Sequence, residues 1–238
     1  IGSAMHFSLK DGTLPLLTTK KVAWKTCLRE LLWFVNGYTS NDKLLDNNVK
    51  IWKGNASREF LDSRGLYNLR ENDLGPVYGH QWRHFNAQYG TCDENKYSRR
   101  LIISAWNPCQ LDEMALPPCH VLAHFNVLDT DKLSCNLYQR SGDVGLGVPF
   151  NIASYSFLTH LIANHCGLKA HEFIYHLGNC HIYDDHLDIL KIQAEREAYP
   201  FSTLKIDVMR ENINDYVEKD FVISDYTYHP AVKMEMRK

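Results

Sequence analysis

Residues 116–143 read LPPCHVLAHFNVLDTDKLSCNLYQRSGD, and two alternating runs lie within this stretch. Apolar residues alternate with other residues along 121–127, and a second alternating run follows along 133–139. Alternation with a period of two is typical of half-buried β-strands. The connection Asp129–Lys132 is short, so the two runs are expected to form a hairpin.

Helices and further strands are expected on both sides of this hairpin. Helical spacing followed by a glycine stop marks two segments, Trp24–Asn36 before Gly37 and Ala153–Cys166 before Gly167. Strand-like composition marks three segments, namely Leu101–Trp106, which we expect to be buried, Glu172–Tyr183 and Pro200–Met209. A further helix is expected from Asp184, as its cap, to about Glu197, with three residues facing inward: Leu187, Leu190 and Ile192.

These elements predict an α/β (α+β) protein with a mixed sheet and flanking helices. The order of helices and strands has no regular β-α-β rhythm, and no G-x-G-x-x-G motif occurs, which argues against a dinucleotide-binding fold. No stretch rich in Pro, Gly or Ser divides the chain, so residues 1–238 are interpreted as a single domain.

Composition excludes several classes of protein. The 238 residues are 45% apolar and 23% charged with a net charge of −2, unlike a disordered chain. No basic surplus indicates a nucleic-acid-binding or membrane-surface protein, and the longest apolar run, Leu31–Val35, is far too short to cross a bilayer. The first five residues do not resemble a signal peptide. Seven cysteines without a C-x-x-C pair predict free thiols in a reducing compartment, the cytoplasm.

Cys119 differs from the other cysteines in its sequence context. Pro117 and Pro118 precede it, and their rings fix the backbone ahead of the thiol before any substrate arrives. The other cysteines lie in helix or strand patterns, where a thiol packs as a small hydrophobic group. Nearby cations make a thiol a good nucleophile, so Cys119 is a candidate for covalent chemistry. A rigid entry into the following strand explains the same local pattern.

A second cluster of polar residues ends the hairpin. Gln139–Asp143 close the second strand, and the glycine-rich turn Gly145–Asn151 leads into a helix. Arg140 offers a planar fork that suits phosphate, and Ser141 offers a hydroxyl donor. Asn151 could recognise a ring amide, because its side chain both donates and accepts hydrogen bonds. The alternative is a simple hairpin exit in which Asn151 caps the helix.

Two other groups of charged residues also allow two interpretations. Arg99 and Arg100 stand at a strand start, where they form either a solvated edge or a phosphate site. Glu30 lies near the edge of an apolar helix stripe. If its carboxylate is partly buried, its pKa is raised and it could act as a general acid, whereas a surface position would make it inert.

The twelve histidines raise the question of a metal site, and we expect none. His120 and His124 are expected to share one face of a strand, with Cys119 pointing to the other, and the spacing suggests no third ligand. The same alternation argues against a thiol hydrolase, because His120 could not easily activate the neighbouring thiol.

Ten stretches taken together resemble the thymidylate synthase family, and they cover nearly the whole chain. They keep the order and spacing of that family, and they are Pro15–Lys20, Glu30–Phe34, Asp73–Gly79, Gln81–Arg83, Ala105–Pro108, Met114–His120, Tyr138–Ser141, Gly145–Tyr155, His181–Tyr183 and Lys233–Met236. The resemblance implies a large twisted mixed sheet with helices, whose open faces pack sheet to sheet in a homodimer.

The resemblance also implies a reaction, the reductive methylation of dUMP to dTMP. The cosubstrate 5,10-methylenetetrahydrofolate supplies the carbon and the hydride and leaves as dihydrofolate, and no metal takes part. Cys119 is expected to attack C6 of the uracil. The residues implied in catalysis are Cys119, Glu30, Tyr78, His120, Arg140, Asn151 and Asp143.

Two binding sites follow from the same resemblance. The implied dUMP-binding residues are Arg99, Arg100, Gln139, Arg140, Ser141, Asp143, Asn151, His181 and Tyr183, with Arg99 and Arg100 reaching the phosphate from the partner subunit. The implied folate-binding residues are Lys20, Ile51, Trp52, Asn55, Asp143, Leu146, Gly147, Phe150 and Tyr183, with Asp143 on the pterin and Lys20 at the glutamate tail. RNA binding is known in the family but is not indicated by the charge.

The chain departs from the family pattern at three places. The family has an arginine-bearing phosphate loop upstream of the match to Met5–Phe7, and a helix-length segment where this chain joins Tyr97 directly to Ser98. It also ends in small apolar residues, where this chain ends in Arg237-Lys238. We interpret these as missing stretches rather than as natural deletions, and such loops are expected to close on ligands.

Alternatives to this function remain open. A deoxycytidylate hydroxymethylase has the same fold but is expected to carry Asp in place of Asn151, because a cytosine amino group needs an acceptor. A non-catalytic nucleotide- or RNA-binding homologue belongs to a different class of protein. The sequence also allows this chain to be one part of a bifunctional protein that includes dihydrofolate reductase.

Overall fold

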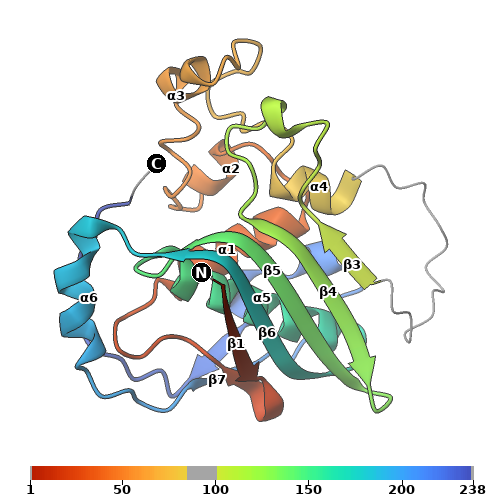
Figure 1. The fold of residues 1–238 in the computed structure, drawn as a ribbon. Helices are drawn as coiled ribbons and strands as arrows, with labels where there is room; N and C mark the ends of the chain where they lie inside the picture. Colours follow the sequence, from red (N-terminus) through yellow and green to blue (C-terminus); the bar gives the residue numbers. More distant parts are fainter. Residues whose placement is uncertain (1, 85–100, 237–238) are drawn as a thin grey trace.

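The structure is a computed structural model that describes residues 2–84 and 101–236 (Figure 1). Within these ranges the strands are β1 (Ser3–Ser8), β2 (Thr13–Leu14), β3 (Leu101–Ser104), β4 (His120–Leu128), β5 (Lys132–Asp143), β6 (Lys169–His181), β7 (Ser202–Lys205) and β8 (Val222–Ser224). The helices are α1 (Trp24–Val35), α2 (Asp42–Leu45), α3 (Arg58–Ser63), α4 (Tyr78–His84), α5 (Gly147–His165) and α6 (Leu187–Ala194).

Five of the described strands form one mixed sheet in the order β1-β6-β5-β4-β3. The pair β5 and β6 is parallel, and the other three pairs are antiparallel. A parallel pair needs a crossover connection, and α5 supplies it. The hairpin β4–β5 turns at Asp129 and Thr130, which both have positive φ. The predicted hairpin and the predicted mixed sheet are therefore confirmed.

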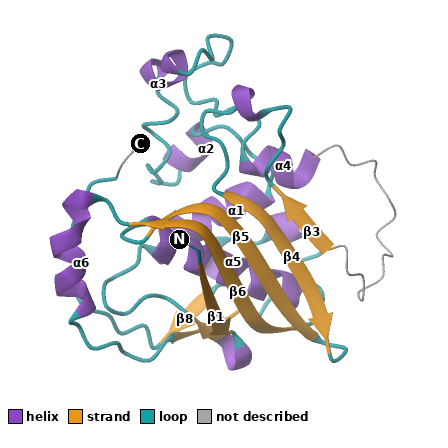
Figure 2. Ribbon diagram, viewed as in Figure 1, coloured by secondary structure: helices purple, strands orange, loops and turns teal. Residues whose placement is uncertain are grey.

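Helices cover one face of this sheet (Figure 2). Helix α5 packs against β5 and β6, and α1 packs against α5. Residues 151–161 of α5 are all buried, because this helix lies between the sheet and α1. No described helix covers the other face, where Tyr138 of β5 and Ile102 of β3 are 45% and 52% exposed. We refer to this second face as the outer face.

A separate apolar cluster lies above the edge of the sheet where β4 begins (Figure 1). It joins Trp33 and Phe34 near the end of α1 to Trp52 and to Tyr78 at the start of α4. The rings of Phe34 and Tyr78 lie 4.8 Å apart, and those of Trp33 and Trp52 lie 6.4 Å apart. Aromatic packing of this kind fixes the loops around the polar residues described below.

Three predictions about elements were wrong in detail. The strand expected at Leu101–Trp106 ends at Ser104 and lies at the sheet edge, so it is not buried. Asp184 caps no helix; it opens a 3-10 turn, and α6 begins only at Leu187. Leu187 and Ile192 do not face inward, being 41% and 60% exposed, because α6 lies beside the sheet rather than over it (Figure 2).

Two further corrections concern residues of the candidate site. A register shift between His120 and Leu122 reverses the alternation of β4, so His120 is buried whereas His124 is on the outer face. The two histidines therefore do not share a face. Helix α5 begins at Gly147 rather than Ala153, because Pro149 stands in the first turn, where its missing N–H has no helical partner. Asn151 therefore lies inside the helix and does not cap it.

Candidate active site

Cys119 is fixed by backbone hydrogen bonds on both sides. Its N–H donates to the hydroxyl of Tyr78 at 2.6 Å, and its carbonyl accepts from the N–H of Arg140 at 3.0 Å. The two bonds link α4, the Pro117-Pro118 segment and β5 at the start of β4. The half-buried thiol is therefore held in one place by three elements of the fold.

Arg140 braces the segment that carries this thiol. Its Nε donates to the carbonyl of Pro118 at 2.8 Å, and its Nη2 donates to the carbonyl of Pro117 at 3.0 Å. The guanidinium also lies over the ring of Trp106, 5.7 Å from its centroid. Nη1 has no hydrogen-bond partner among the described residues, so this end of the fork can bind a ligand.

Burial and charge act on the thiol in opposite directions. Desolvation raises the pKa of Cys119 above its ordinary value of 9.0, and the positive charge of Arg140 lowers it. Burial outweighs the charge of Arg140, so the thiol is protonated at neutral pH in the chain without ligands.

A chain of buried hydrogen bonds orients the side chain of Asn151. The hydroxyl of Tyr175 donates to Gln139 Oε1 at 2.7 Å, and Gln139 Nε2 donates to Asn151 Oδ1 at 3.0 Å. Asn151 Nδ2 lies 2.8 Å from His120 Nε2. An amide nitrogen only donates, so Nε2 accepts and the proton of a neutral His120 ring is on Nδ1. Burial lowers the pKa of His120 to about 4, which keeps this ring neutral at pH 7.

Glu30 is buried, and this decides between the two positions that the sequence left open. It lies on α1 and is 7% exposed, and Trp52 Nε1 donates to its Oε1 at 2.7 Å. Desolvation raises the pKa of Glu30 to about 7, although the Trp52 bond favours the charged form. Glu30 can therefore exchange a proton near neutral pH.

Asp143 organises the turn between β5 and α5. Its Oδ1 accepts from the N–H of Gly145 at 2.8 Å, and its Oδ2 accepts from the N–H of Leu146 at 3.2 Å. The ammonium of Lys20 donates to the carbonyl of Gly145 in the same turn. Lys20 is 5% exposed, and burial lowers its pKa while the charge of Asp143 raises it. Lys20 therefore holds the turn instead of extending into solvent.

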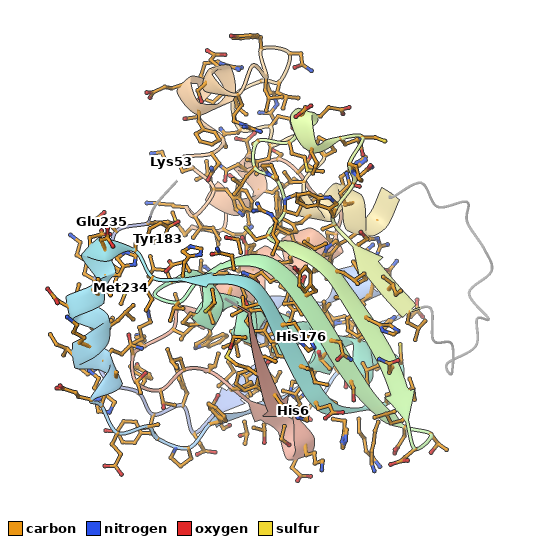
Figure 3. The ribbon with its side chains drawn as sticks, in the orientation of Figure 1. His6, Lys53, His176, Tyr183, Met234 and Glu235 are labelled. Atoms are coloured by element: carbon orange, nitrogen blue, oxygen red, sulfur yellow. The ribbon has the colours of Figure 1, made fainter. Side chains whose placement is uncertain are left out.

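Three rings pack in series at the end of β6 and in the segment that follows it. His181 Nδ1 bonds Asn179 Oδ1 at 2.8 Å, and the rings of His181 and Tyr183 lie 5.2 Å apart at a steep angle. The ring of His186 lies 5.6 Å from that of Tyr183. Figure 3 shows Tyr183 with its side chain at this end of the strand.

The structure brings together some of the expected residues and leaves others apart. Cys119, Arg140, Gln139, Asn151, His120 and Tyr78 form one bonded group. Ser141 belongs to it through its carbonyl, which accepts from Gln139. Leu146, Gly147 and Phe150 follow Asp143 at the start of α5. Ile51 and Asn55 lie before α3, and no hydrogen bond between described residues joins them to the Asp143 turn. Arg99 and Arg100 lie outside the described residues.

Sequence reasoning missed three residues that hold this site. Tyr175 looks like an ordinary inward residue of a strand, so no signal distinguishes it. Trp106 stands within the Ala105–Pro108 match, but only the fold places its ring under Arg140. His186 follows the His181–Tyr183 match by three residues, and that proximity was the available signal.

Other site types are not supported by the described residues. No group of three His, Cys, Asp or Glu side chains is placed to hold a metal ion within 2–84 and 101–236. No helix in these ranges has the length and hydropathy needed to cross a bilayer. Cys27, Cys109, Cys119, Cys135 and Cys180 are free thiols among the described residues.

Comparison with known proteins identifies the family. The family model described as thymidylate synthase matches residues 1–238. The chain belongs to the thymidylate synthase family. The fold agrees with this assignment, since the mixed sheet with helices is that expected of the family.

Several curated relatives carry the same name. A bifunctional dihydrofolate reductase-thymidylate synthase of Leishmania major is 52% identical over 255 residues, which cover 99% of this chain and 49% of that protein. Thymidylate synthases of Homo sapiens and Saccharomyces cerevisiae are 50% and 48% identical and are covered to 80% and 85% of their lengths. The chain thus spans about half the length of the bifunctional relatives and most of the length of the monofunctional ones.

Proposed function

We propose that this chain is a methyltransferase that converts dUMP to dTMP. The cosubstrate is 5,10-methylenetetrahydrofolate, which supplies both the one-carbon unit and the hydride and leaves as dihydrofolate. One observation carries the proposal, namely that a backbone-fixed thiol on Cys119 lies beside the cation of Arg140, and that the next residue, His120, bonds the oriented amide of Asn151. A nucleophile, a phosphate ligand and a pyrimidine-reading amide are the groups that this reaction needs.

The first step takes place on the uracil ring of dUMP. The thiolate of Cys119 forms a bond to C6, and the displaced electron pair makes C5 nucleophilic toward the one-carbon unit. Arg140 favours the thiolate and binds the phosphate through Nη1, with Ser141 beside it. Asn151 pairs with the ring amide, so its orientation by Gln139 selects uracil.

Proton transfer is assigned to groups whose pKa values fit it. Glu30, with a pKa of about 7, gives and takes a proton near the pyrimidine carbonyl through water. Tyr78 has its pKa raised by burial, so its hydroxyl stays protonated, and neutral His120 lies against it with the ring centroids 5.0 Å apart. These two rings belong to the network that removes the C5 proton.

The remaining contacts are assigned to the ribose and to the folate. His181 and Tyr183 hold the ribose hydroxyl. Asp143 binds the pterin, and the pocket around it is lined by Ile51, Trp52, Asn55, Leu146, Gly147, Phe150 and Tyr183. Lys20 is assigned to the glutamate tail, and because its ammonium is buried against Gly145, it must turn outward to reach that tail.

A homodimer completes this site. The outer face carries exposed apolar side chains, Ile102 and Tyr138 among them, and a second copy of the same face is the proposed cover. Arg99 and Arg100 are assigned to the phosphate site of the partner subunit. Mixing refolded Cys119→Ser and Arg100→Ala subunits tests this, because mixed dimers then hold one intact site and should recover about a quarter of the parent activity. Absence of recovery on mixing contradicts the shared site.

Trapping of a covalent adduct tests the reaction itself. The full chain is incubated with 5-fluoro-dUMP and methylenetetrahydrofolate, and its intact mass is measured. The expected mass increase equals one nucleotide plus one folate and is lost in Cys119→Ser. Cys109→Ser removes an exposed thiol that no hydrogen bond between described residues joins to Cys119, and this matched control should still form the adduct. No adduct in the folded parent chain would favour a non-catalytic nucleotide- or RNA-binding homologue.

A cytoplasmic location fits this function. Five of the described cysteines, Cys27, Cys109, Cys119, Cys135 and Cys180, are free thiols, which are typical of a reducing compartment. The nucleophile Cys119 itself must stay unpaired to react, so an oxidising compartment would inactivate the enzyme.

A further inference from the structure

Residues 105–119 join β3 to β4, and we call them the β3–β4 loop. Part of this loop lies directly on the backbone that precedes α4. The N–H of Ala115 donates to the carbonyl of Leu74 at 3.0 Å. Gly75, with φ +71°, approaches so closely that a Cβ there would lie 2.2 Å from the carbonyl oxygen of Glu113. The segment before α4 therefore fixes this half of the loop.

The other half of the loop is held by one buried side chain, that of Gln81 on α4, a helix that packs against β3 (Figure 1). Gln81 is 1% exposed, and its Nε2 donates to the carbonyl of Pro76 and to Gln110 Oε1, both at 2.9 Å. Asn107 Nδ2 donates to the same Gln110 oxygen at 2.8 Å and makes a longer bond to Gln81 Oε1 at 3.4 Å. These three amides are all bonded to one another, and we call them the amide node.

The amide node fixes a tight turn of the loop. Asn107 Oδ1 accepts from the N–H of Cys109 at 3.2 Å, and the Asn107 carbonyl accepts from the N–H of Gln110 at 3.0 Å. A side chain that accepts from the backbone two residues further on stabilises a turn at that place. The chemistry proposed above uses none of the three amides, so their bonds serve the position of this turn.

The residue before this turn contacts the candidate phosphate ligand. The centroid of the Trp106 ring lies 5.7 Å from the guanidinium of Arg140. On one side of Trp106, the N–H of Ala105 donates to the carbonyl of Val121 at 3.0 Å, and on the other side Asn107 belongs to the amide node. The backbone of Trp106 is therefore held at both ends, by β4 and by the node.

We propose that Gln81 is a positioning residue that holds the Trp106 ring against Arg140. It does so by anchoring the turn 107–110, which begins directly after that ring. A guanidinium supported on an aromatic face loses less freedom when it binds an anion, so the support raises the affinity for a phosphate-bearing ligand. The identity of that ligand as dUMP rests on the proposed function, whereas the anchoring of the loop does not.

Two isosteric substitutions separate this role from a general loss of stability. Gln81→Met keeps the length of the side chain and removes its amide. Asn41→Leu is the matched control, since Asn41 is also a fully buried amide and its Nδ2 donates to Asn72 Oδ1 at 2.9 Å. No hydrogen bond between described residues joins Asn41 or Asn72 to the β3–β4 loop. Both variants leave buried partners unpaired, so thermal unfolding should show a similar fall in Tm.

Hydrogen exchange tests the anchoring without any enzymatic activity. In the ligand-free chain, peptides that cover the β3–β4 loop should exchange several-fold faster in Gln81→Met than in the parent, because the loop opens more often without its anchor. The same peptides should exchange in Asn41→Leu as they do in the parent. Unchanged exchange in Gln81→Met, or an equal acceleration in both variants, overturns the anchoring role.

Binding of dUMP tests the link to Arg140. Calorimetry should show about tenfold weaker binding in Gln81→Met, because a cation–aromatic contact shielded from water contributes about that much. Binding to Asn41→Leu should change little. Unchanged dUMP binding in Gln81→Met overturns the link to Arg140, whereas a parent chain that binds no dUMP refutes the proposed function and leaves the result of hydrogen exchange standing.

A double variant shows whether Gln81 acts through the ring. Trp106→Leu removes the aromatic support and should weaken dUMP binding by a similar factor. The double variant Gln81→Met with Trp106→Leu should bind no more weakly than Trp106→Leu alone, because both substitutions remove one and the same support. If the two losses multiply instead, Gln81 acts on binding by another route, and the proposal is overturned.

Discussion

The candidate site has two parts, which we call the nucleotide side and the folate side after the ligands proposed for them. The two parts are held together in different ways. On the nucleotide side, side chains on strands and on α5 bond one another, as in the chain from Tyr175 through Gln139 and Asn151 to His120. On the folate side, separate loops meet through backbone atoms, such as the N–H and carbonyl of Gly145.

This difference predicts how each side responds to change. Strands and helices place a side chain more precisely than loops do, so the nucleotide side suits covalent chemistry. Loops joined by a few backbone bonds open at low cost, so the folate side suits binding and release of a large cosubstrate. A substitution on the first side should therefore lower turnover, and one on the second should raise the folate KM.

Replacement of Arg140 is expected to cause the largest loss of activity. Arg140→Ala removes the proposed phosphate ligand, two hydrogen bonds that hold the Cys119 segment, and the charge that lowers the thiol pKa. The kcat/KM for dUMP should fall about a thousandfold, as for other lost charge contacts in enzyme sites. Loss of the cation raises the pKa of Cys119 further, so the rate of thiol alkylation by iodoacetamide should drop at every pH below that pKa.

Arg58 provides a control for that result. It also braces two backbone carbonyls, those of Leu66 and Leu69, but it lies on α3 away from Cys119. Arg58→Ala should destabilise the fold without changing the alkylation of Cys119. Similar alkylation profiles in both variants would contradict the electrostatic role of Arg140.

Replacement of Glu30 is expected to cause the next largest loss of activity. It should also change how the stability of the fold depends on pH. Glu30→Gln removes a proton donor with a pKa of about 7, and kcat should fall about a hundredfold. Its ordinary pKa is about 4.5, so between pH 4.5 and 7 the folded chain binds more protons than the unfolded chain. The parent should therefore lose about 3 kcal/mol of stability as the pH rises through this window, while Glu30→Gln should not.

Urea unfolding at several pH values measures this linkage. From pH 5 to pH 8, the free energy of unfolding of the parent should fall relative to that of Glu30→Gln. Parallel curves for the two proteins would show that the carboxyl of Glu30 titrates normally, and the assigned proton transfer would then lose its physical basis.

Much of the fold could be predicted from local sequence patterns. The hairpin β4–β5 and the helix α1 have strong periodicity, and both formed close to the expected bounds. The errors arose where tertiary packing overrides local pattern. The shift of register after His120 has no sequence signature, and Leu187 and Ile192 of α6 face solvent although their spacing suggested a core.

The candidate site could also be predicted only in part. Motifs locate Cys119, Arg140 and Asn151, because proline, glycine and polar residues stand at unusual places in the chain. Contacts between distant segments could not be predicted, since neither Tyr175 nor His186 differs locally from an ordinary strand or loop residue. The net rise in the pKa of Cys119 also required the fold, because burial outweighs the cation that the sequence suggested.

Gly145→Ala tests the folate side with a smaller expected effect. The added Cβ would stand 2.9 Å from His186 Nδ1 and 3.0 Å from Met234 Sδ, so the turn must move away from both side chains. The folate KM should rise about tenfold, whereas kcat with saturating folate and the affinity for dUMP should change little. A fall in kcat at unchanged folate KM would show that the turn belongs to the chemistry rather than to binding.

Tyr175→Phe is expected to have the smallest effect, and it tests whether the nucleotide side acts as a bonded unit. Loss of the hydroxyl leaves Gln139 Oε1 buried without its donor, which costs about 1–2 kcal/mol of stability. If Gln139 transmits orientation to Asn151, kcat/KM for dUMP should also fall about threefold while the folate KM stays constant.

The matched control is Tyr216→Phe, since the Tyr216 hydroxyl is also buried and accepts from Asn164 Nδ2 at 3.1 Å, outside the site. Thermal unfolding should show a similar loss of stability in both variants, and kinetics should separate them. If Tyr175→Phe is as active as Tyr216→Phe, Asn151 is oriented by its helix alone. The two sides of the site would then differ less than their hydrogen bonds suggest, because each would depend on backbone position more than on side-chain bonding.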